Sequence, residues 1–286
     1  MVRLGIYGYE CTREAVFDMY RMVPLSNTHQ EVEALASDRN AYNLTAFLEV
    51  NSESANYLRQ LIFDLEGVLS FIDQKDVLIA NRLRDSEDYG QLAEDYPKSI
   101  SGHFRHSGGG KVVMSDAFSS DSRRTFIELA MAKLTDTTDT NNATFRGAFY
   151  KSIEVFRARQ RFIDVSFYLL FSALESLSRA ALSDTSPNCA KPIGQLLRTY
   201  GFDIYENSVR DLRKSVSTYA RLRNALFHNG KHEAETNVNG TTITLALSDY
   251  LSPFERLVPL VMMKYIGFDD GRTNWNSWLD RMMFKS

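Results

Sequence analysis

The chain has little cysteine, no long apolar run and no large excess of charge of either sign. Its 286 residues include two cysteines, Cys11 and Cys189, which can build neither a disulfide framework nor a thiolate metal cage. Free thiols are typical of a reducing compartment. No stretch reaches the roughly 18 apolar residues of a membrane span, and the amino terminus lacks the apolar core of a signal peptide. We therefore expect a cytoplasmic protein with no membrane partner.

The charge balance argues against a protein that coats nucleic acid. Lysine and arginine number 33 against 36 acidic residues, for a formal net charge of −3. Contact with nucleic acid must then come from a local basic patch. Glycine-rich dinucleotide fingerprints, zinc-ligand spacings and calcium loops are also missing from the sequence. The composition, 44% hydrophobic and 24% charged, is that of an ordinary globular protein.

A polar run at residues 135–143, rich in threonine, aspartate and asparagine, divides the chain into two parts. Residues 1–138 are expected to form an α+β recognition or regulatory domain. Residues 144–286 are expected to form an all-α helical bundle.

The amino-terminal part carries mixed periodicities. We predict a strand at 42–50, a helix at 54–65, a turn leading into a strand at 108–113, and a helix at 123–134. Two apolar runs, 68–73 and 77–83, fit either type of element.

The carboxy-terminal part has mainly helical periodicity. Helices are predicted for a long run at 145–182 and for 193–200, 208–228, 253–268 and 274–284. Residues 231–241 are predicted to be a polar loop, and 242–247 a short strand. Asn229 and Gly230 should end the third of these helices in a left-handed cap.

The most informative feature is an arginine within an apolar helical stripe. Arg223 falls among the apolar positions of the helix predicted for 208–228. A guanidinium there needs an anionic partner, because it does not deprotonate. That partner is either a protein carboxylate such as Glu175, which would fix the packing of two helices, or a ligand phosphate.

His228 follows Arg223 by five residues, so the two side chains point about 140° apart on an ideal helix. They can converge on one atom if the last turn distorts, or if two copies of the helix meet across a two-fold axis. Histidine moves protons near neutral pH, and arginine stabilises charge developing on phosphate. Asn224 could hold a phosphate oxygen or orient the imidazole. His228 could instead simply favour the carboxyl end of the helix.

A basic stripe accompanies the motif. Arg210, Lys214 and Arg221 fall on the opposite face of the predicted helix. Residues 208–230 carry five cationic side chains against one carboxylate. The stripe is either a path for RNA or an ordinary solvated face.

Two segments resemble the HEPN superfamily. They are Leu170-Phe171-Ser172-Ala173-Leu174-Glu175-Ser176-Leu177 and Arg221-Leu222-Arg223-Asn224-Ala225-Leu226-Phe227-His228-Asn229-Gly230. The Arg-Asn-x3-His-x-Gly form is similar to the ApeA-like branch of that superfamily. The resemblance covers roughly residues 145–285.

The resemblance implies a helical bundle that dimerises and places an Arg-x(4–6)-His motif from each copy at a shared cleft. Many such domains are metal-independent endoribonucleases of antiphage defence or toxin systems. Arg223 and His228 match the two motif letters, Asn224 the polar neighbour, and Glu175 an acidic position of the first helix. The implied protein is a homodimeric nuclease that acts on RNA and needs no metal or other cofactor. From the two-part architecture we further expect the amino-terminal domain to restrain the nuclease, sense a trigger or meet a regulatory partner. The alternative is a non-catalytic module that binds RNA or a nucleotide, or only dimerises.

The segment His103-Phe104-Arg105-His106-Ser107-Gly108-Gly109-Gly110-Lys111 is a further candidate. Two histidines without a helix to hold them make a poor metal site, and valine after Lys111 breaks the spacing of a phosphate-binding loop. A mobile glycine-rich loop is the interpretation we adopt. Trp275 and Trp278 are expected to pack the last helix against the bundle.

Overall fold

The computed structural model describes residues 1–51, 54–84, 88–280 and 282–285. The chain separates into two compact units, Met1–Lys133 and Leu134–Ser286. The division lies just before the polar run at 135–143, at the end of helix α3 (Ser122–Thr135). Each unit is described separately.

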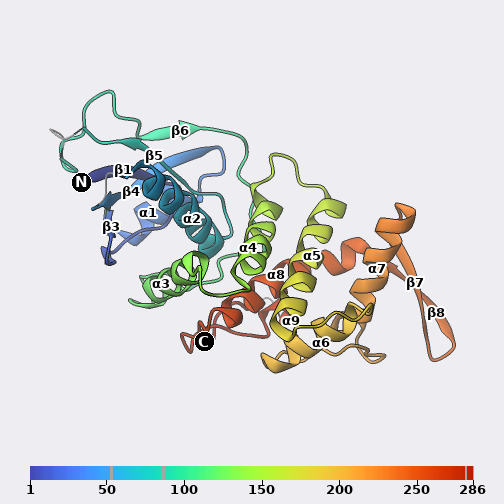
Figure 1. Cartoon of the computed structure of the whole chain (residues 1–286). Coiled ribbons are helices and arrows are strands. Elements are labelled where there is room, and N and C mark those ends of the chain that lie inside the picture. The colour runs from blue at the N-terminus through green and yellow to red at the C-terminus, as the bar shows by residue number, and fades with distance from the viewer. Residues whose placement is uncertain (52–53, 85–87, 281, 286) are drawn as a thin grey trace. The chain divides into compact units, whose positions relative to one another are not determined.

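Unit 1 is an antiparallel sheet with helices packed against it (Figure 1). The strands are β1 (Val2–Tyr7), β2 (Ala15–Val16), β3 (Tyr20–Pro24), β4 (Ala41–Val50), β5 (Leu78–Arg82) and β6 (Ser99–Ser101). Their order is β2-β3-β4-β1-β5, and β6 pairs with the start of β4. The helices are α1 (His29–Ser37), α2 (Ala55–Asp73) and α3.

The middle of the sheet is buried on both faces. Seven consecutive residues of β4 are buried, as expected for a strand covered on both sides. An aromatic cluster packs on one face of the sheet and consists of Tyr7, Tyr42, Leu44, Phe47, Leu83 and Tyr96. The rings of Phe71 and Phe126 stack 5.4 Å apart between α2 and α3.

The predictions for 42–50 and 123–134 are confirmed by β4 and α3. The helix predicted for 54–65 continues to Asp73, so the apolar run at 68–73 is its last turn. The strand predicted within 108–113 is wrong. Its backbone bonds instead to the end of α2, where the Val112 amide donates to the Ile72 carbonyl at 2.9 Å.

Unit 2 is a helical bundle with one added β-hairpin. Its main elements are α4 (Asn142–Arg157), α5 (Ile163–Leu182), α6 (Ala190–Thr199), α7 (Val216–Asn229), β7 (Glu233–Val238), β8 (Thr241–Ala246), α8 (Leu247–Tyr265) and α9 (Ser277–Asp280). Helix α5 packs against α4, α6, α7 and α8. Rings of Phe167, Phe171, Tyr219 and Phe254 meet in the core between α5, α7 and α8.

Among the described residues, α5 is long and apolar enough to cross a membrane on length and composition alone. Residues along most of its length are buried among the neighbouring helices of the bundle. The central helix of a bundle passes the same test.

Three helix predictions for unit 2 need correction. The run at 145–182 is two helices, because the polar segment after Arg157 is extended and turns the chain between them. The helix predicted for 274–284 reduces to the single turn α9, because Thr273 and Phe284 pair with each other and close the segment as a loop. Residue 281 lies outside the described part.

The helix predicted for 208–228 begins only at Val216. The amide of Val216 donates to Tyr205, whose own amide donates to Lys214, so this backbone is in an extended bridge. The Asp211 carboxylate accepts a hydrogen bond from the Arg213 backbone amide at 3.0 Å. Such side-chain bonds to the backbone compete with helix formation. The cap predicted at the other end is confirmed, since Gly230 has φ +62°.

The polar loop predicted for 231–241 is mostly strand β7, which pairs with β8. The register runs from Glu233 opposite Ala246 to Val238 opposite Thr241. Asn239 and Gly240 form the turn, with φ +52° and +84°. Positive φ at both positions is the two-residue hairpin geometry that Asn-Gly favours.

Candidate functional site

Arg223 lies on the face of α7 that meets α5. Its Nη2 is 3.8 Å from Glu175 Oε2, and its Nη1 donates to Asn224 Oδ1 at 3.0 Å. The guanidinium carbon lies 5.8 Å from the Phe171 ring and 5.5 Å from the Phe227 ring. These contacts hold Arg223 at the edge of the bundle with 31% of its side chain exposed.

The Arg223 guanidinium keeps unused donors. Its Nε is buried and has no hydrogen-bond partner among the described residues. The carboxylate of Glu175 is held mainly by Arg179, whose Nε and Nη2 lie 3.1 and 3.0 Å from Oε1. Arg223 therefore has an anionic neighbour but no close, two-pronged partner of the kind that a guanidinium binds best.

His228 lies in the last turn of α7 and is exposed. Together with Asn224, four residues earlier, it lines a groove of about 590 Å³ between α7 and β7. Arg223 does not line this groove. Within one chain the two motif side chains therefore diverge, as the helical spacing predicts.

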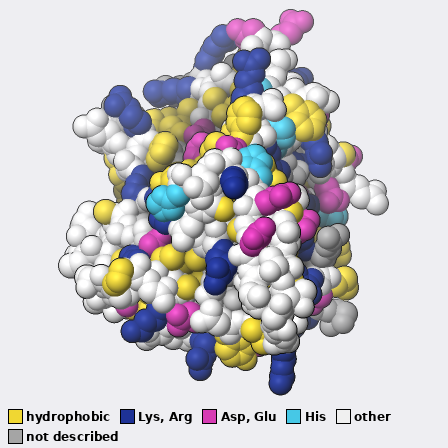
Figure 2. Space-filling view, turned by 90° about the vertical axis from the view of Figure 1, so that its right-hand side faces the viewer, with side chains coloured by type: hydrophobic (Ala, Val, Ile, Leu, Met, Phe, Trp, Pro, Cys, Tyr) yellow, Lys and Arg dark blue, Asp and Glu magenta, His cyan; other side chains and the backbone are white. Residues whose placement is uncertain are grey.

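The groove is not strongly basic. Arg221 and Lys231 line it, and so do Glu233 and Glu235 of β7. Figure 2, which faces the right-hand side of Figure 1, shows lysine and arginine scattered over this face with acidic side chains among them. The two cations that line the groove are thus matched by two carboxylates of β7.

The predicted basic stripe does not form a helix face. Arg210 and Lys214 precede α7, and Lys214 is paired with the Asp203 carboxylate. Only Arg221 lies on the helix itself, exposed beside the groove. The predicted helix began at residue 208, but α7 begins at Val216. The basic stripe needed residues 210 and 214 to be helical.

An exposed apolar face adjoins Arg223. On α5 and its cap, Phe162, Val165 and Tyr168 are 57%, 48% and 39% exposed. Phe227 of α7 is 49% exposed, and its ring centroid lies 4.5 Å from that of Tyr168. Phe227 thus reaches outward over Arg223, whose guanidinium carbon is 5.5 Å from its ring centre.

Cys189, the cap residue of α6, lies close enough to the motif for the charges of Glu175 and Arg223 to affect the pKa of its thiol. Burial raises the pKa of the thiol, as does the Glu175 carboxylate. A protonated thiol is a weak nucleophile. Nothing in the sequence links Cys189 to the motif, because only the fold brings α6 beside α5.

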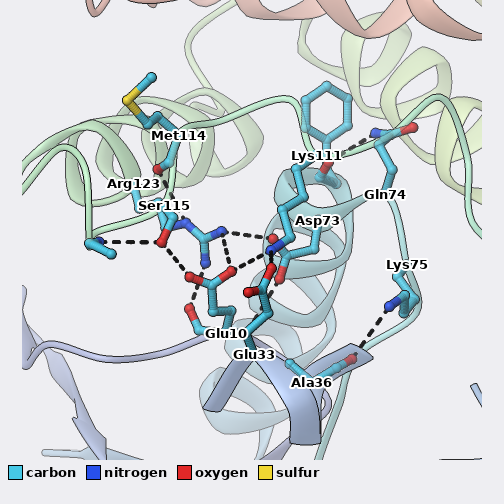
Figure 3. Close-up of polar contacts among 12 residues, drawn as sticks. Glu10, Glu33, Ala36, Asp73, Gln74, Lys75, Lys111, Met114, Ser115 and Arg123 are labelled. Carbon is cyan, nitrogen blue, oxygen red and sulfur yellow. Dashed lines mark hydrogen bonds and ion pairs between the residues drawn. The ribbon is translucent and has the colours of Figure 1, made fainter. Parts of the chain in front are cut away.

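Unit 1 contains a second concentration of charge, buried around Glu10 (Figure 3). Arg123 Nη2 lies 2.9 Å from Asp73 Oδ1 and 3.4 Å from Glu10 Oε2. Lys111 Nζ lies 2.6 Å from Glu10 Oε2 and 2.9 Å from Glu33 Oε1. Arg123 and Lys111 together lower the pKa of Glu10 against the opposing effect of burial. The network joins five segments of unit 1, which contain Glu10, Glu33, Asp73, Lys111 and Arg123.

The loop that contains His103 and His106 is a structural element of unit 1. Arg105 is 1% exposed and donates to five backbone carbonyls, of Gly8, Ala36, Asp38, Ala41 and Asp76. In the parts of the chain that the structure describes, no group of three histidine, cysteine or acidic side chains could hold a metal ion.

The tryptophans pack as expected at the end of the bundle. Trp278 is 1% exposed, and the Lys264 ammonium lies 3.7 Å from the ring centre of Trp275.

The chain is similar to none of the known proteins with which it was compared: no protein family matches it, and no curated protein or solved structure does. Its function must therefore be inferred from its own residues and their geometry.

Proposed function

We propose that the chain is a metal-independent endoribonuclease of the HEPN type, active as a homodimer. The observation that carries this proposal is the state of Arg223. Its Nε lacks a hydrogen-bond partner in the described chain, and its nearest carboxylate is 3.8 Å away. Arg105, by contrast, uses all three guanidinium nitrogens on carbonyl oxygens. A phosphate would supply Arg223 with the close anionic partner that it lacks.

The dimer explains how Arg223 and His228 can act together although they diverge in one chain. A second copy packed on the apolar face of Phe162, Val165, Tyr168 and Phe227 would bring two α7 ends towards one substrate. Exposed aromatic side chains are favoured at the centres of protein interfaces. Each copy would then supply an arginine and a histidine to one cleft.

The proposed chemistry is attack of a ribose 2′-hydroxyl on the adjacent phosphorus. One His228 accepts the hydroxyl proton, and a protonated His228 donates a proton to the departing 5′-oxygen. Arg223 stabilises the negative charge on the pentacoordinate phosphorus, and Asn224 positions a phosphate oxygen. The products are a 2′,3′-cyclic phosphate and a 5′-hydroxyl.

We propose a cytoplasmic enzyme, and the resemblance implies a defence or toxin-like role for it. Unit 1 would restrain the nuclease or sense a trigger, either alone or by binding a regulatory partner. Free nuclease activity would harm the cell that makes it.

A second candidate is a non-catalytic module that binds RNA or a nucleotide, or only holds a dimer together. The contact between Arg223 and Glu175 favours it, because that pair connects α7 to α5 without any ligand. The balanced charge of the groove beside His228 points the same way.

The experiment is RNA cleavage by the purified full-length chain in excess EDTA. His228→Ala is compared with His232→Ala, a matched control because His232 is also exposed and lies just beyond the cap of α7. The proposal expects products ending in 2′,3′-cyclic phosphate, lost in His228→Ala and kept in His232→Ala. Cleavage that survives in His228→Ala would remove His228 from the chemistry. Binding of RNA by a dimer that cuts no RNA would establish the non-catalytic binding module instead.

A further inference from the structure

A cationic and aromatic cluster in unit 1 consists of Arg39, just after α1, Lys75, just after α2, and Phe104 of the loop at residues 103–107. One contact joins Arg39 to Phe104, and another places Lys75 beside the end of α1. The Arg39 guanidinium carbon is 5.8 Å from the ring centre of Phe104, and Lys75 Nζ lies 3.3 Å from the Ser37 carbonyl, two residues before Arg39.

Phe104 is held outward. Its side chain is 47% exposed, although the next residue, Arg105, is among the most buried of unit 1. The His106 ring meets Phe104 edge-on at 5.2 Å. The Arg105 side chain bonds to backbone carbonyls of other segments of unit 1, and these bonds hold the loop in place with Phe104 facing outward. A ring displayed in this way is available for stacking.

The two cations of the cluster lack carboxylate partners within the described chain. Lys75 Nζ bonds only to carbonyl oxygens, those of Ala36 and Ser37, as Figure 3 shows for Ala36. Arg39 has the Phe104 ring as its contact. Burial and the charges of Arg105 and Arg39 together lower the pKa of Lys75 to about 8, against the opposing attraction of Asp73. Among the described residues, two positive charges without an ion-paired carboxylate therefore lie near each other here.

We propose that this cluster binds single-stranded nucleic acid, with a base stacked on Phe104 and an adjacent phosphate at Arg39 and Lys75. Aromatic side chains beside cations are how proteins bind unpaired strands without reading sequence. A phosphate would pair with Arg39 and Lys75, and a base would cover the exposed Phe104 ring. A phosphorylated peptide would satisfy the cations but would leave the ring uncovered.

This inference concerns unit 1 and does not depend on His228 being catalytic. A strand held here would give unit 1 a recognition role, whatever unit 2 does with the strand. Binding is measured with a DNA as well as an RNA oligonucleotide, so a loss of binding is scored separately from a loss of RNA cleavage.

The test uses full-length His228→Ala protein and fluorescence anisotropy with fluorescein-labelled 12-nucleotide oligouridylate and oligothymidylate. Phe104→Ala is compared with Phe118→Ala, a more exposed phenylalanine of the same unit. Arg39→Ala is compared with Arg124→Ala, whose guanidinium pairs with Glu128 on the surface of α3. Circular dichroism and melting curves establish that each variant folds.

The expected result is that Phe104→Ala weakens binding of both oligonucleotides roughly 5- to 100-fold, the effect of losing one stacked base. Arg39→Ala should weaken binding and lower the dependence of log affinity on log salt by about one phosphate contact. The two control variants should bind like the parent. Inorganic polyphosphate should lose affinity with Arg39→Ala and keep it with Phe104→Ala.

Equal affinities of Phe104→Ala and the parent for both oligonucleotides would overturn the proposal. So would an equal loss in Phe118→Ala, or a loss of polyphosphate binding in Phe104→Ala as large as the loss of oligouridylate binding. Binding of a phosphoserine peptide in preference to either oligonucleotide would assign the cluster to a protein partner instead.

Discussion

Arg223 on α7 and Glu175 on α5 face each other with 3.8 Å between Nη2 and Oε2, while a second arginine, Arg179 of α5, holds the same carboxylate at 3.0 Å. Arg223 is the weaker of two partners competing for one anion. A phosphate arriving at Arg223 would not have to displace a close ion pair, because the existing one is long and partly exposed.

Replacing Glu175 with glutamine should therefore strengthen RNA binding. The change removes a negative charge from beside the expected phosphate, and partly exposed pairs of this kind contribute only about 0–1 kcal/mol to stability. We expect the dissociation constant for a short RNA, measured in the His228→Ala background, to fall roughly two- to fivefold, as ~0.5–1 kcal/mol implies. Glu206→Gln, at a carboxylate that accepts the Asn188 amide, is the control. Unchanged RNA affinity with a large loss of stability would mean that the pair serves packing alone.

Phe227→Glu should dissociate the dimer. The ring is 49% exposed and lies against Tyr168 at the centre of the proposed interface. A carboxylate there would be desolvated without a partner, and hot-spot residues typically cost ~2 kcal/mol or more, which is about 30-fold in the dissociation constant. Analytical ultracentrifugation across a concentration series measures this, with cleavage followed in parallel. Val209→Glu, 61% exposed and preceding α7, should remain a dimer. A dimer that persists in Phe227→Glu would move the interface elsewhere.

Asp116 gives unit 1 a predicted pH dependence of stability. Burial raises its pKa to about 6, against the opposing attraction of Arg123 and with the help of Glu10. The folded state therefore holds a proton that the unfolded state has lost between about pH 4 and 6. Stability linked to Asp116 is fully present below that window and is lost as the pH rises through 6. Asp116→Asn should accordingly stabilise the chain by about 1–3 kcal/mol at pH 7.5 and by little at pH 4.

Denaturant unfolding of the parent and Asp116→Asn at the two pH values tests this expectation. Asp121→Asn, an exposed change just before α3, controls for general effects of charge. An equal gain in stability at both pH values would show that the Asp116 carboxyl is ionised throughout.

Lys75 should react with amine reagents faster than the other lysines at pH 8. With a pKa of about 8, roughly half of it is neutral there, whereas a lysine at the usual value is less than about 1% neutral. Brief labelling with an acetylating ester, followed by peptide mass spectrometry, gives the relative rates. Oligouridylate should protect Lys75, because a phosphate stabilises the ammonium form. Slow labelling of Lys75 without oligonucleotide would mean that its amine is less accessible or more basic than the geometry indicates.

Arg105→Met should destabilise unit 1 severely. The substitution leaves five carbonyl oxygens near a side chain that cannot donate. The cost of stranding buried polar groups and losing this anchor is about 3–5 kcal/mol. Arg124→Met, which breaks only an exposed pair with Glu128, should stay within roughly 0.5 kcal/mol of the parent. Chemical denaturation of both variants decides; a small effect at Arg105 would show that water replaces the guanidinium.

Much of the fold was predictable because its periodicity is local. The strand β4, helix α3 and the cap at Gly230 all follow from patterns of a few residues. The start of α7 did not, because an extended bridge between Tyr205 and Ser215 overrides an apolar spacing that continues through 208–215. The β7–β8 hairpin was missed although Asn239-Gly240 is the strongest two-residue signal for one; the polar composition of β7 concealed it.

The candidate site was predictable only in part, for a similar reason. The motif residues and the pairing of Arg223 with Glu175 follow from helical spacing and the cost of a buried charge. Glu233 and Glu235, which balance the groove, could not be placed there without the hairpin, and Cys189 without the docking of α6. Charge balance at a surface depends on which segments meet, and periodicity within one segment carries no information about that.

Arg105 also bears on how unit 1 is made. Its acceptors come from Gly8, from 36–41 and from Asp76, so none of these contacts can form until the ribosome has delivered residue 105. Protein domains commonly begin to fold as they emerge, but this anchor can form only once more than a third of the chain exists. A nascent chain arrested before residue 105 should therefore be cut by proteases more readily than one arrested after the loop has emerged, although β1 and its partner strands β4 and β5 are already made in both.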